Sequence, residues 1–289
     1  MLLAECSKVK KYFEDRLIVQ IDELKIYFGD RIGIVGINGS GKTTLLNLLS
    51  QRLDADEGVI KLYDKVSYIS QLDPPRNKNL GSKWANKFGV KPTWDESMSG
   101  GEKTRFKVAL ALEENNKLLF ADEPTSNIDI ESITLMEEKF KEYKGALVVI
   151  SHDRNFLDKL CDQILEIEDG KIKIYKGNYS DYSQQKIKER ERLKFEYEQY
   201  ISEKQRLEQA ISKIKQKEQS IKRPPKRMGN SEARLHKMGG QRAKANLDST
   251  TKSIKKRIEH LEVKENPKKQ KKIHLDILKS NQSYSKIII

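Results

Sequence analysis

Residues 36–43 read GINGSGKT, and this glycine-rich stretch decides the fold of the first part of the chain. It stands between the apolar run RIGIV at 31–35 and the helical pattern Thr44–Leu49, the context that a phosphate-binding loop requires. Glycines let backbone N–H groups surround phosphates at a helix N-terminus. We expect Lys42 to contact the β- and γ-phosphates of a nucleotide and the Thr43 hydroxyl to bind Mg²⁺. A glycine turn that merely precedes a helix is the alternative.

A second half of a phosphate-transfer site follows in the sequence LLFADE at Leu118–Glu123. An apolar strand there would bring Asp122 to a magnesium ion and Glu123 to the attacking water, as general base or water-positioning group. An acidic pair after a strand can instead cap the next helix. The phosphate loop favours the catalytic interpretation.

Residues 1–183 alternate short apolar runs with helical stretches. The runs are rich in β-branched residues, which is typical of buried strands, and their alternation with helices predicts an α/β domain with a mostly parallel sheet. The candidate strands are Leu17–Gln20, Arg31–Val35, Val66–Ile69, Lys117–Ala121, Leu147–Ser151 and Ile164–Ile167.

From Gln184 the pattern changes to helix with heptad spacing. A first seam contains Leu193, Tyr197, Tyr200, Leu207, Ile211, Ile214 and Ile221, and a second contains Leu247, Ile254, Ile258 and Leu261. Between them, Pro224-Pro225 and Gly229-Asn230 interrupt the helix. This pattern predicts an antiparallel helical hairpin; two unpaired, solvated helices are the alternative.

The formal net charge of +13 is divided unevenly along the chain. Residues 1–183 hold 27 Lys and Arg against 30 Asp and Glu, a net charge of −3. Residues 184–289 hold 29 against 13, a net charge of +16. The first part therefore resembles an ordinary soluble domain, and the second part is a candidate polyanion-binding arm.

Cysteine usage and hydropathy indicate a cytoplasmic protein without direct membrane insertion. Cys6 and Cys161 have no disulfide or metal spacing, which favours a reducing compartment. No apolar run approaches the roughly 18 residues of a membrane span, and the first residues, MLLAECSKVKKYF, lack the layout of a signal peptide.

Further motifs occur in a fixed order around the phosphate loop. Gln71 follows the strand-like YIS, SGGE occupies Ser99–Glu102, PTSNID occupies Pro124–Asp129, and ISHDR places His152 after another apolar run. In this order the motifs of residues 1–183 resemble those of the ATP-binding cassette (ABC) superfamily. The superfamily pattern LSGGQ reads MSGGE here, with Met98 in the apolar position.

The resemblance implies an ABC-type nucleotide-binding domain with a mixed, mostly parallel sheet, which hydrolyses ATP with Mg²⁺. It implies catalytic roles for Glu123, His152 and Gln71, and magnesium contacts from Thr43, Gln71 and Asp122. The implied ATP-binding residues are Phe13, Gly36, Asn38, Gly39, Ser40, Gly41, Lys42, Thr43 and Thr44, with Tyr12 as the alternative to Phe13 for stacking on adenine. The implied signature that acts across a cassette interface is Ser99, Gly100, Gly101 and Glu102, and Asp129 belongs to the loop that links two sites.

Two features indicate which family of the superfamily this chain resembles. Ser99 follows Gln71 by only 28 positions, whereas transporter cassettes hold a larger docking subdomain there. The sequence KGNYSDY at 176–182 then leads into the basic hairpin, a layout that resembles the ABC-F translation factors, and most closely their antibiotic-resistance ribosome-protection group. This implies a ribosome partner, with contacts to rRNA and P-site tRNA near the peptidyl-transferase centre. The ATPase subunit of a transporter and a general ABC-F translation factor are the alternatives.

The hairpin tip, at about 219–247, agrees with an RNA partner. Clustered cations bind phosphate backbones through counterion release, and Arg can stack on unpaired bases. A merely solvated charged face is the alternative. The candidate RNA contacts are Lys222, Arg223, Lys226, Arg227, Arg234, Lys237, Arg242 and Lys244, against the single acid Glu232.

We expect three parts: an ATP-binding domain at 1–183, the hairpin linker at 184–272, and a tail at 273–289 that resembles the start of a second cassette. ATP sites in the superfamily form between two cassettes, normally joined in one chain, and this sequence carries one set of motifs. The resemblance therefore implies a truncated chain that is a poor ATPase alone, or one that self-associates.

Overall fold

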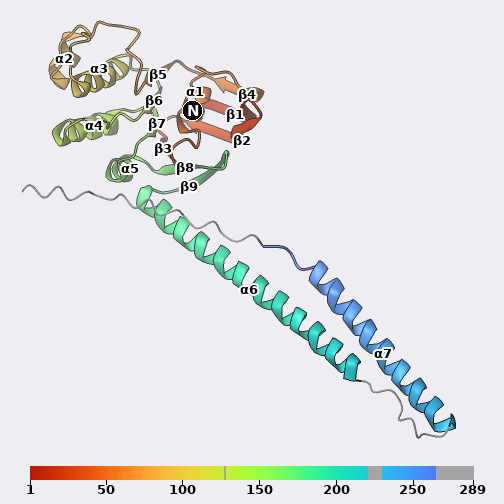
Figure 1. Cartoon of the computed structure of the whole chain (residues 1–289). Coiled ribbons are helices and arrows are strands. Elements are labelled where there is room, and N and C mark those ends of the chain that lie inside the picture. Colours follow the sequence, from red (N-terminus) through yellow and green to blue (C-terminus); the bar gives the residue numbers. More distant parts are fainter. Residues whose placement is uncertain (127, 221–229, 265–289) are drawn as a thin grey trace, which may run out of the picture. The chain divides into compact units, whose positions relative to one another are not determined.

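The computed structural model describes residues 1–126, 128–220 and 230–264, without side-chain detail at 219–220 and 230–242. It divides into two compact units, Met1–Ile187 and a second one from Lys188 onward. The first unit is an α/β domain, and the second contains most of one long helix and all of another (Figure 1).

The described strands of the α/β domain form one mixed sheet in the order β4-β1-β2-β9-β8-β3-β7-β6-β5. Strands β5, β6, β7, β3 and β8 are parallel neighbours, which confirms the mostly parallel expectation, while β1 pairs antiparallel with β2 and β4. Strand β9 is antiparallel to β8 and parallel to β2, so it joins the two parts. The strands are β1 (Leu2–Phe13), β2 (Arg16–Tyr27), β3 (Arg31–Val35), β4 (Glu57–Leu62), β5 (Val66–Ile69), β6 (Leu118–Asp122), β7 (Ala146–Ile150), β8 (Gln163–Glu168) and β9 (Lys171–Lys176).

The central strands are apolar throughout because both of their faces are covered. In β6, Leu118 and Phe120 belong to a core cluster with the residues of α1 and the antiparallel strands. Leu119 and Ala121 alternate with them and belong to the cluster under α3, α4 and α5. Helix α1 therefore lies on one face of the parallel strands and α3, α4 and α5 on the other (Figure 1). The helices are α1 (Lys42–Leu49), α2 (Ser82–Phe88), α3 (Gly100–Glu113), α4 (Ile130–Glu142), α5 (Arg154–Leu160), α6 (Tyr179–Ser220) and α7 (Asn230–Glu259).

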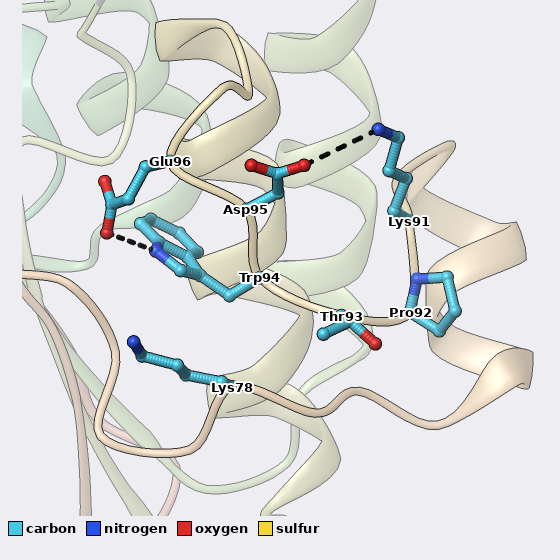
Figure 2. Close-up of a pocket in the computed structure, with 7 residues that line it drawn as sticks. All are labelled: Lys78, Lys91, Pro92, Thr93, Trp94, Asp95 and Glu96. Carbon is cyan, nitrogen blue, oxygen red and sulfur yellow. Dashed lines mark hydrogen bonds and ion pairs between the residues drawn. The ribbon is translucent and has the colours of Figure 1, made fainter.

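The interval between Gln71 and Ser99 contains the single helix α2 and a loop that folds back on α3. Trp94 of this loop packs edge-on against Phe106 of α3, with ring centroids 5.4 Å apart, and its indole N–H donates to Glu96 Oε1 at 2.9 Å (Figure 2). The interval thus holds one helix of seven residues, in agreement with its short length in the sequence.

The α/β domain extends past the expected boundary at residue 183, because the start of α6 is fixed to β8. The hydroxyl of Tyr182 donates to Glu166 Oε1 at 2.8 Å, and Lys186 Nζ contacts Glu166 Oε2 at 2.6 Å. Glu166 also accepts a hydrogen bond from Tyr175 at 3.1 Å. The first compact unit consequently ends at Ile187.

In the second unit, α6 and α7 form an antiparallel hairpin. Glu203 of α6 pairs with Arg257 of α7 at 3.1 Å, while Glu196, earlier in α6, pairs with Lys264, after the end of α7, at 3.7 Å. Leu207 of the predicted seam is buried between these helices. The expectation is wrong for Leu193, whose side chain is 41% exposed. Figure 1 shows α6 and α7 side by side.

Helix α7 begins at Asn230, whereas its predicted seam begins only at Leu247. The Pro224-Pro225 break, Ile221 and the tail at 273–289 lie outside the described residues. Among the helices that the structure describes, none combines the length and the hydropathy needed to cross a bilayer.

Candidate functional site

The loop at 36–41 connects β3 to α1 and has the backbone shape of an anion cradle. Gly39 and Gly41 have φ values of +76° and +101°, in the left-handed region that glycine adopts without strain. A Cβ atom at Gly36 would lie 2.6 Å from Ser40 Oγ and 2.8 Å from the Ile167 carbonyl oxygen, so the backbone has no room for a side chain. The N-terminal N–H groups of α1 are therefore available to phosphate oxygens.

Lys42 is folded onto its own loop. Its Nζ donates to the carbonyl oxygens of Gly36 at 3.0 Å and Ile37 at 3.2 Å. Burial lowers the pKa of Lys42, and the nearby charges of Glu123 and Asp122 oppose that shift. Because the ammonium group is partly desolvated, phosphate oxygens could replace the two carbonyl acceptors. The remaining predicted ATP-binding residues of this segment, Asn38, Ser40, Thr43 and Thr44, lie in the loop or the first turn of α1.

Two buried acidic residues lie at the carboxyl end of β6: Asp122 is its last residue and Glu123 follows it. Asp122 is 3% exposed and Glu123 is 8% exposed. Burial raises the pKa of both carboxyl groups. Asp122 Oδ1 and Glu123 Oε1 have no hydrogen-bond partner among the described residues, which is unusual for buried polar atoms and marks a functional site.

The loops after β6 and β7 fix the position of Glu123. Its backbone N–H donates to the Ile150 carbonyl at 2.9 Å, and its Oε2 accepts from the His152 N–H at 3.2 Å. The His152 Nε2 atom lies 3.4 Å from Glu123 Oε1. Glu123 has a φ of +51°, a left-handed conformation that costs energy for a non-glycine residue. The structure therefore brings Glu123 and His152 together.

Oxygen donors near the phosphate loop suit magnesium. Asp122 supplies a buried carboxylate, and a hydrogen bond from Thr43 opposes the rise of its pKa. Mg²⁺ prefers oxygen ligands and usually keeps waters and substrate phosphates in its shell, so one or two protein ligands suffice. Among the described residues, no group of three or more His, Cys, Asp or Glu side chains is placed to hold a metal ion.

Gln71 follows β5 and is exposed. No hydrogen bond of its side chain is described; its carbonyl oxygen accepts from Lys107 Nζ at 3.2 Å. Phe13, at the turn between β1 and β2, is also exposed, with 51% of its surface accessible, whereas Tyr12 beside it is half-buried. The greater exposure of Phe13 favours it as the adenine-stacking residue.

The segment Ser99–Glu102 forms the N-terminus of α3, where Glu102 has a local structural role. Ser99 Oγ accepts from the Glu102 N–H at 3.2 Å, and Glu102 Oε2 accepts from the Ser99 N–H at 2.8 Å. This reciprocal pair is a capping box, which explains why Glu can replace the usual Gln of the signature. Ser99 and Gly100 are exposed, and the helix lies apart from α1 (Figure 1).

Asp129 caps the next helix. Its Oδ1 accepts from the Ser132 N–H at 2.8 Å, and its Oδ2 lies 3.5 Å from Arg105 NH1 of α3. Arg105 also donates to Ser132 Oγ at 2.7 Å. The loop at Asp129 is thus tied to the signature helix.

For most of the candidate RNA contacts, the structure does not describe the side chain. Lys222, Arg223, Lys226 and Arg227 lie outside the described residues. Arg234, Lys237 and Arg242 lie in α7 without side-chain detail, and Lys244 is exposed.

Sequence reasoning missed Arg105 and Lys107, the two cations of α3 that contact the loops at Asp129 and Gln71. Their helical spacing shows which side of α3 each occupies, but no local pattern shows which loop lies beside it.

Comparison with known families agrees with this geometry. A family model described as ABC transporter matches residues 19–81, which contain the phosphate loop, and a second model of the same description matches residues 165–238. The chain belongs to the ATP-binding cassette superfamily. Within the superfamily, the similar proteins MsrA, VmlR and EttA are ABC-F proteins, which confirms the resemblance to that family.

Three curated relatives share about a third of their aligned residues with this chain. The erythromycin resistance ATP-binding protein MsrA of Staphylococcus epidermidis is 33% identical over 280 residues, which cover 90% of this chain and 55% of MsrA. The ribosome protection protein VmlR of Bacillus subtilis (strain 168) is 32% identical, with 88% and 47% covered. The energy-dependent translational throttle protein EttA of Escherichia coli O6:H1 is 31% identical, with 63% and 38% covered. The chain thus spans about half the length of these relatives, or less.

Solved structures agree on the fold of the cassette. A structure titled as the ATP binding subunit of an ABC transporter superposes with a TM-score of 0.56 at 17% identity, covering 63% of this chain and 92% of that one. At this identity the likeness shows the fold alone.

Proposed function

We propose that this chain is the ATP-binding and ATP-hydrolysing part of an ABC-F protein that acts on the bacterial ribosome in the cytoplasm. The observation that carries the ATPase part is the placement of Glu123. Its carboxylate is buried at the end of β6, held by the His152 N–H at 3.2 Å, and its charge and that of Asp122 act on Lys42 of the phosphate loop.

The geometry supports a division of tasks among the site residues. The loop amides and Lys42 bind the β- and γ-phosphates, and Phe13 stacks on adenine. Glu123, whose pKa is raised by burial, accepts a proton from the attacking water. His152 orients Glu123 and contacts the γ-phosphate. When Mg²⁺ is bound, by Thr43, Asp122 and Gln71, it would neutralise charge that develops on the phosphate oxygens.

The ribosome part of the proposal is supported by the relatives and by charge. VmlR is a ribosome protection protein by name and MsrA is an erythromycin resistance protein. Residues 184–289 carry a net charge of +16, which suits an rRNA or tRNA partner. We propose protection against antibiotics bound near the peptidyl-transferase centre. A second cassette, in the same chain or another, would complete the ATP sites through signature residues such as Ser99.

A general translation factor is the second candidate, and the similarity to the translational throttle protein EttA favours it. A transporter subunit is less well supported, because the interval between Gln71 and Ser99 holds the short helix α2 in place of a large docking subdomain. Expression of the chain together with a second cassette in a drug-sensitive bacterium separates the first two candidates: ribosome protection raises the inhibitory concentration of such antibiotics, whereas a general factor leaves it unchanged.

The substitution Glu123→Gln tests the ATPase part. It keeps the size of the side chain but removes the proton acceptor, so we expect ATP affinity within about twofold of wild type and hydrolysis slower by about 100-fold or more. Fluorescent-nucleotide titration and phosphate release measure the two quantities in the full-length protein. The matched control is Glu138→Gln, an exposed glutamate of α4. Wild-type turnover by Glu123→Gln would show that Glu123 is not the base.

The same variant tests the ribosome part. Blocked hydrolysis should retain the ATP-bound form on ribosomes, so Glu123→Gln should sediment with ribosomes in ATP more strongly than wild type. Equal, weak sedimentation of both proteins with and without ATP would contradict a ribosome partner while leaving the ATPase result intact.

A further inference from the structure

Helix α3 begins with the signature and also reaches the segment that contains Gln71, through one side chain. Lys107, two turns into the helix, donates from Nζ to the carbonyl oxygen of Ser70 at 2.9 Å and to that of Gln71 at 3.2 Å. The contact spans 36 positions of the sequence, so it exists only in the folded domain.

The surroundings of Lys107 restrict where its ammonium group can lie. The side chain is half-buried, and burial lowers its pKa while the charge of Asp73 opposes that shift. Its Nζ lies 6.0 Å from the centre of the Trp94 ring, a weak cation–π contact. Figure 2 shows that the indole of Trp94 is itself held by Glu96. A partly desolvated ammonium between an aromatic face and two carbonyls loses stabilisation if it leaves those carbonyls.

A second set of contacts, which does not involve Lys107, holds the segment 70–73 at Asp73. Asp73 accepts from Ser70 Oγ at 3.0 Å and pairs with Arg52 at 3.1 Å, and the Asp73 N–H donates to Ser70 Oγ at 3.0 Å. These contacts close a turn over Ser70–Asp73. Lys107 holds the backbone of Gln71 itself, while the Gln71 side chain stays exposed and can reach a ligand.

We propose that Lys107 is a positioning residue for ATP hydrolysis: it holds the Gln71 backbone so that the Gln71 amide reaches the magnesium ion and the attacking water. The inference rests on the proposed ATPase function. Helix α3 would then link two functional segments: the signature residue Ser99 caps its N-terminus, and Lys107, two turns later, contacts the backbone of Gln71. A shift of α3 on engagement of a second cassette would displace Gln71 with it.

The test uses Lys107→Met, which keeps the aliphatic stem and removes the ammonium group. Lys103→Met is the matched control, because Lys103 lies one turn earlier on α3, also 6.0 Å from the Trp94 ring, but contacts Glu96 instead of Gln71. In the full-length protein we expect Lys107→Met to lower kcat about tenfold with KM for ATP within about twofold, since small misplacements of a catalytic group are costly. Lys103→Met should match wild type, and Lys107→Arg should recover most of the lost kcat.

Two further measurements separate positioning from general damage. Amide hydrogen exchange of residues 70–73 should become faster in Lys107→Met and stay unchanged in Lys103→Met. In a double-mutant cycle, Lys107→Met should have little further effect on kcat once Gln71→Ala is present. If Lys107→Met does not fold, Lys107→Ala, which also removes the ammonium group, goes through the same assays with the same expected signs.

Several results would overturn the proposal: wild-type kcat in Lys107→Met, a rise in KM without a fall in kcat, or full additivity with Gln71→Ala. These failures differ from failure of the ATPase function, which appears as wild-type hydrolysis by Glu123→Gln. In that case the exchange rates of residues 70–73 still decide whether Lys107 holds the Gln71 backbone.

Discussion

At the scale of one residue, the buried carboxyl group of Asp122 lowers the stability of the folded protein at neutral pH. Its carboxyl group is 3% exposed, and its Oδ1 atom has no hydrogen-bond partner among the described residues. Burial raises its pKa in the folded state above the value of about 3.9 typical of an unfolded chain. The fold therefore opposes ionisation of Asp122, and the stability that the protonated form contributes is lost as the pH rises through the folded pKa.

The substitution Asp122→Asn should accordingly stabilise the nucleotide-free protein. We expect a gain of about 1 kcal/mol at pH 7, or roughly 3 °C in the melting temperature, because the amide carries no charge to desolvate. The gain should shrink as the pH falls, because protonation of the wild-type carboxyl group, whose pKa is raised by burial, removes the buried charge. Thermal melts between pH 4 and 8, without nucleotide or Mg²⁺, measure it, and Asp22→Asn on the exposed part of β2 is the control. A loss of stability at pH 7 would show that the buried charge is compensated.

At the scale of secondary-structure elements, the start of α6 explains the sequence KGNYSDY. Asn178 Oδ1 accepts from the Asp181 N–H at 3.0 Å, and Asp181 Oδ2 accepts from the Asn178 N–H at 3.2 Å, a reciprocal N-terminal cap. The Ser180 N–H donates to Asp158 of α5 at 2.7 Å. Because α5 begins just after His152, the first turn of α6 is in direct contact with the helix that follows the catalytic loop.

The ion pair between Lys186 and Glu166 supplies the prediction at this scale. The two side chains are 12% and 10% exposed, and their charged atoms lie 2.6 Å apart. Lys186→Met leaves Glu166 buried without its cation, so we expect a loss of about 3 kcal/mol in the free energy of unfolding. Urea denaturation of the full chain measures it, with Lys188→Met, an exposed lysine of the same helix, as the control. Equal midpoints for the two variants would mean that Tyr175 and Tyr182 satisfy Glu166 without Lys186.

For the whole molecule, the dominant feature is the partition of charge, −3 in residues 1–183 and +16 in residues 184–289. Attraction to a polyanion then depends on the hairpin, and the near-neutral cassette contributes little to it. Phosphate contacts release counterions, so such binding must weaken as salt is added.

Replacing Arg223, Lys226 and Arg227 with Glu should therefore weaken association with ribosomes. We expect the slope of log affinity against log salt to become shallower by about 2, since about three phosphate contacts are lost. Sedimentation across a salt series measures it. The control carries the same change in charge at Lys61, Lys144 and Lys171, exposed lysines of the cassette. An equal loss in both triple variants would show that net charge, and not the hairpin tip, governs association.

The sequence alone predicted the features that depend on short stretches of chain. Strands β3 and β5 begin and end at the residues that the sequence predicted, and the three central residues of β3 are buried, as expected for an apolar run covered on both faces. The phosphate loop is equally local, since the φ values of Gly39 and Gly41 and the crowding at Gly36 demand glycine. The sequence also placed Glu123 and His152 after apolar strands, and the parallel pairing of β6 with β7 brings the two residues together.

The tertiary structure alone decided the rest. Strands β1, β4 and β9 were not predicted. Strands β4 and β9 expose most of their residues and so lack an apolar run, and in β1 charged residues interrupt the apolar ones. The roles of Lys107 and Glu166 were invisible for a related reason: a charged side chain looks the same in sequence whether it is solvated, holds a distant carbonyl or accepts a hydrogen bond from a tyrosine while buried. These two contacts join residues 37 and 16 positions apart, and only packing of the sheet and helices brings the partners within hydrogen-bond distance.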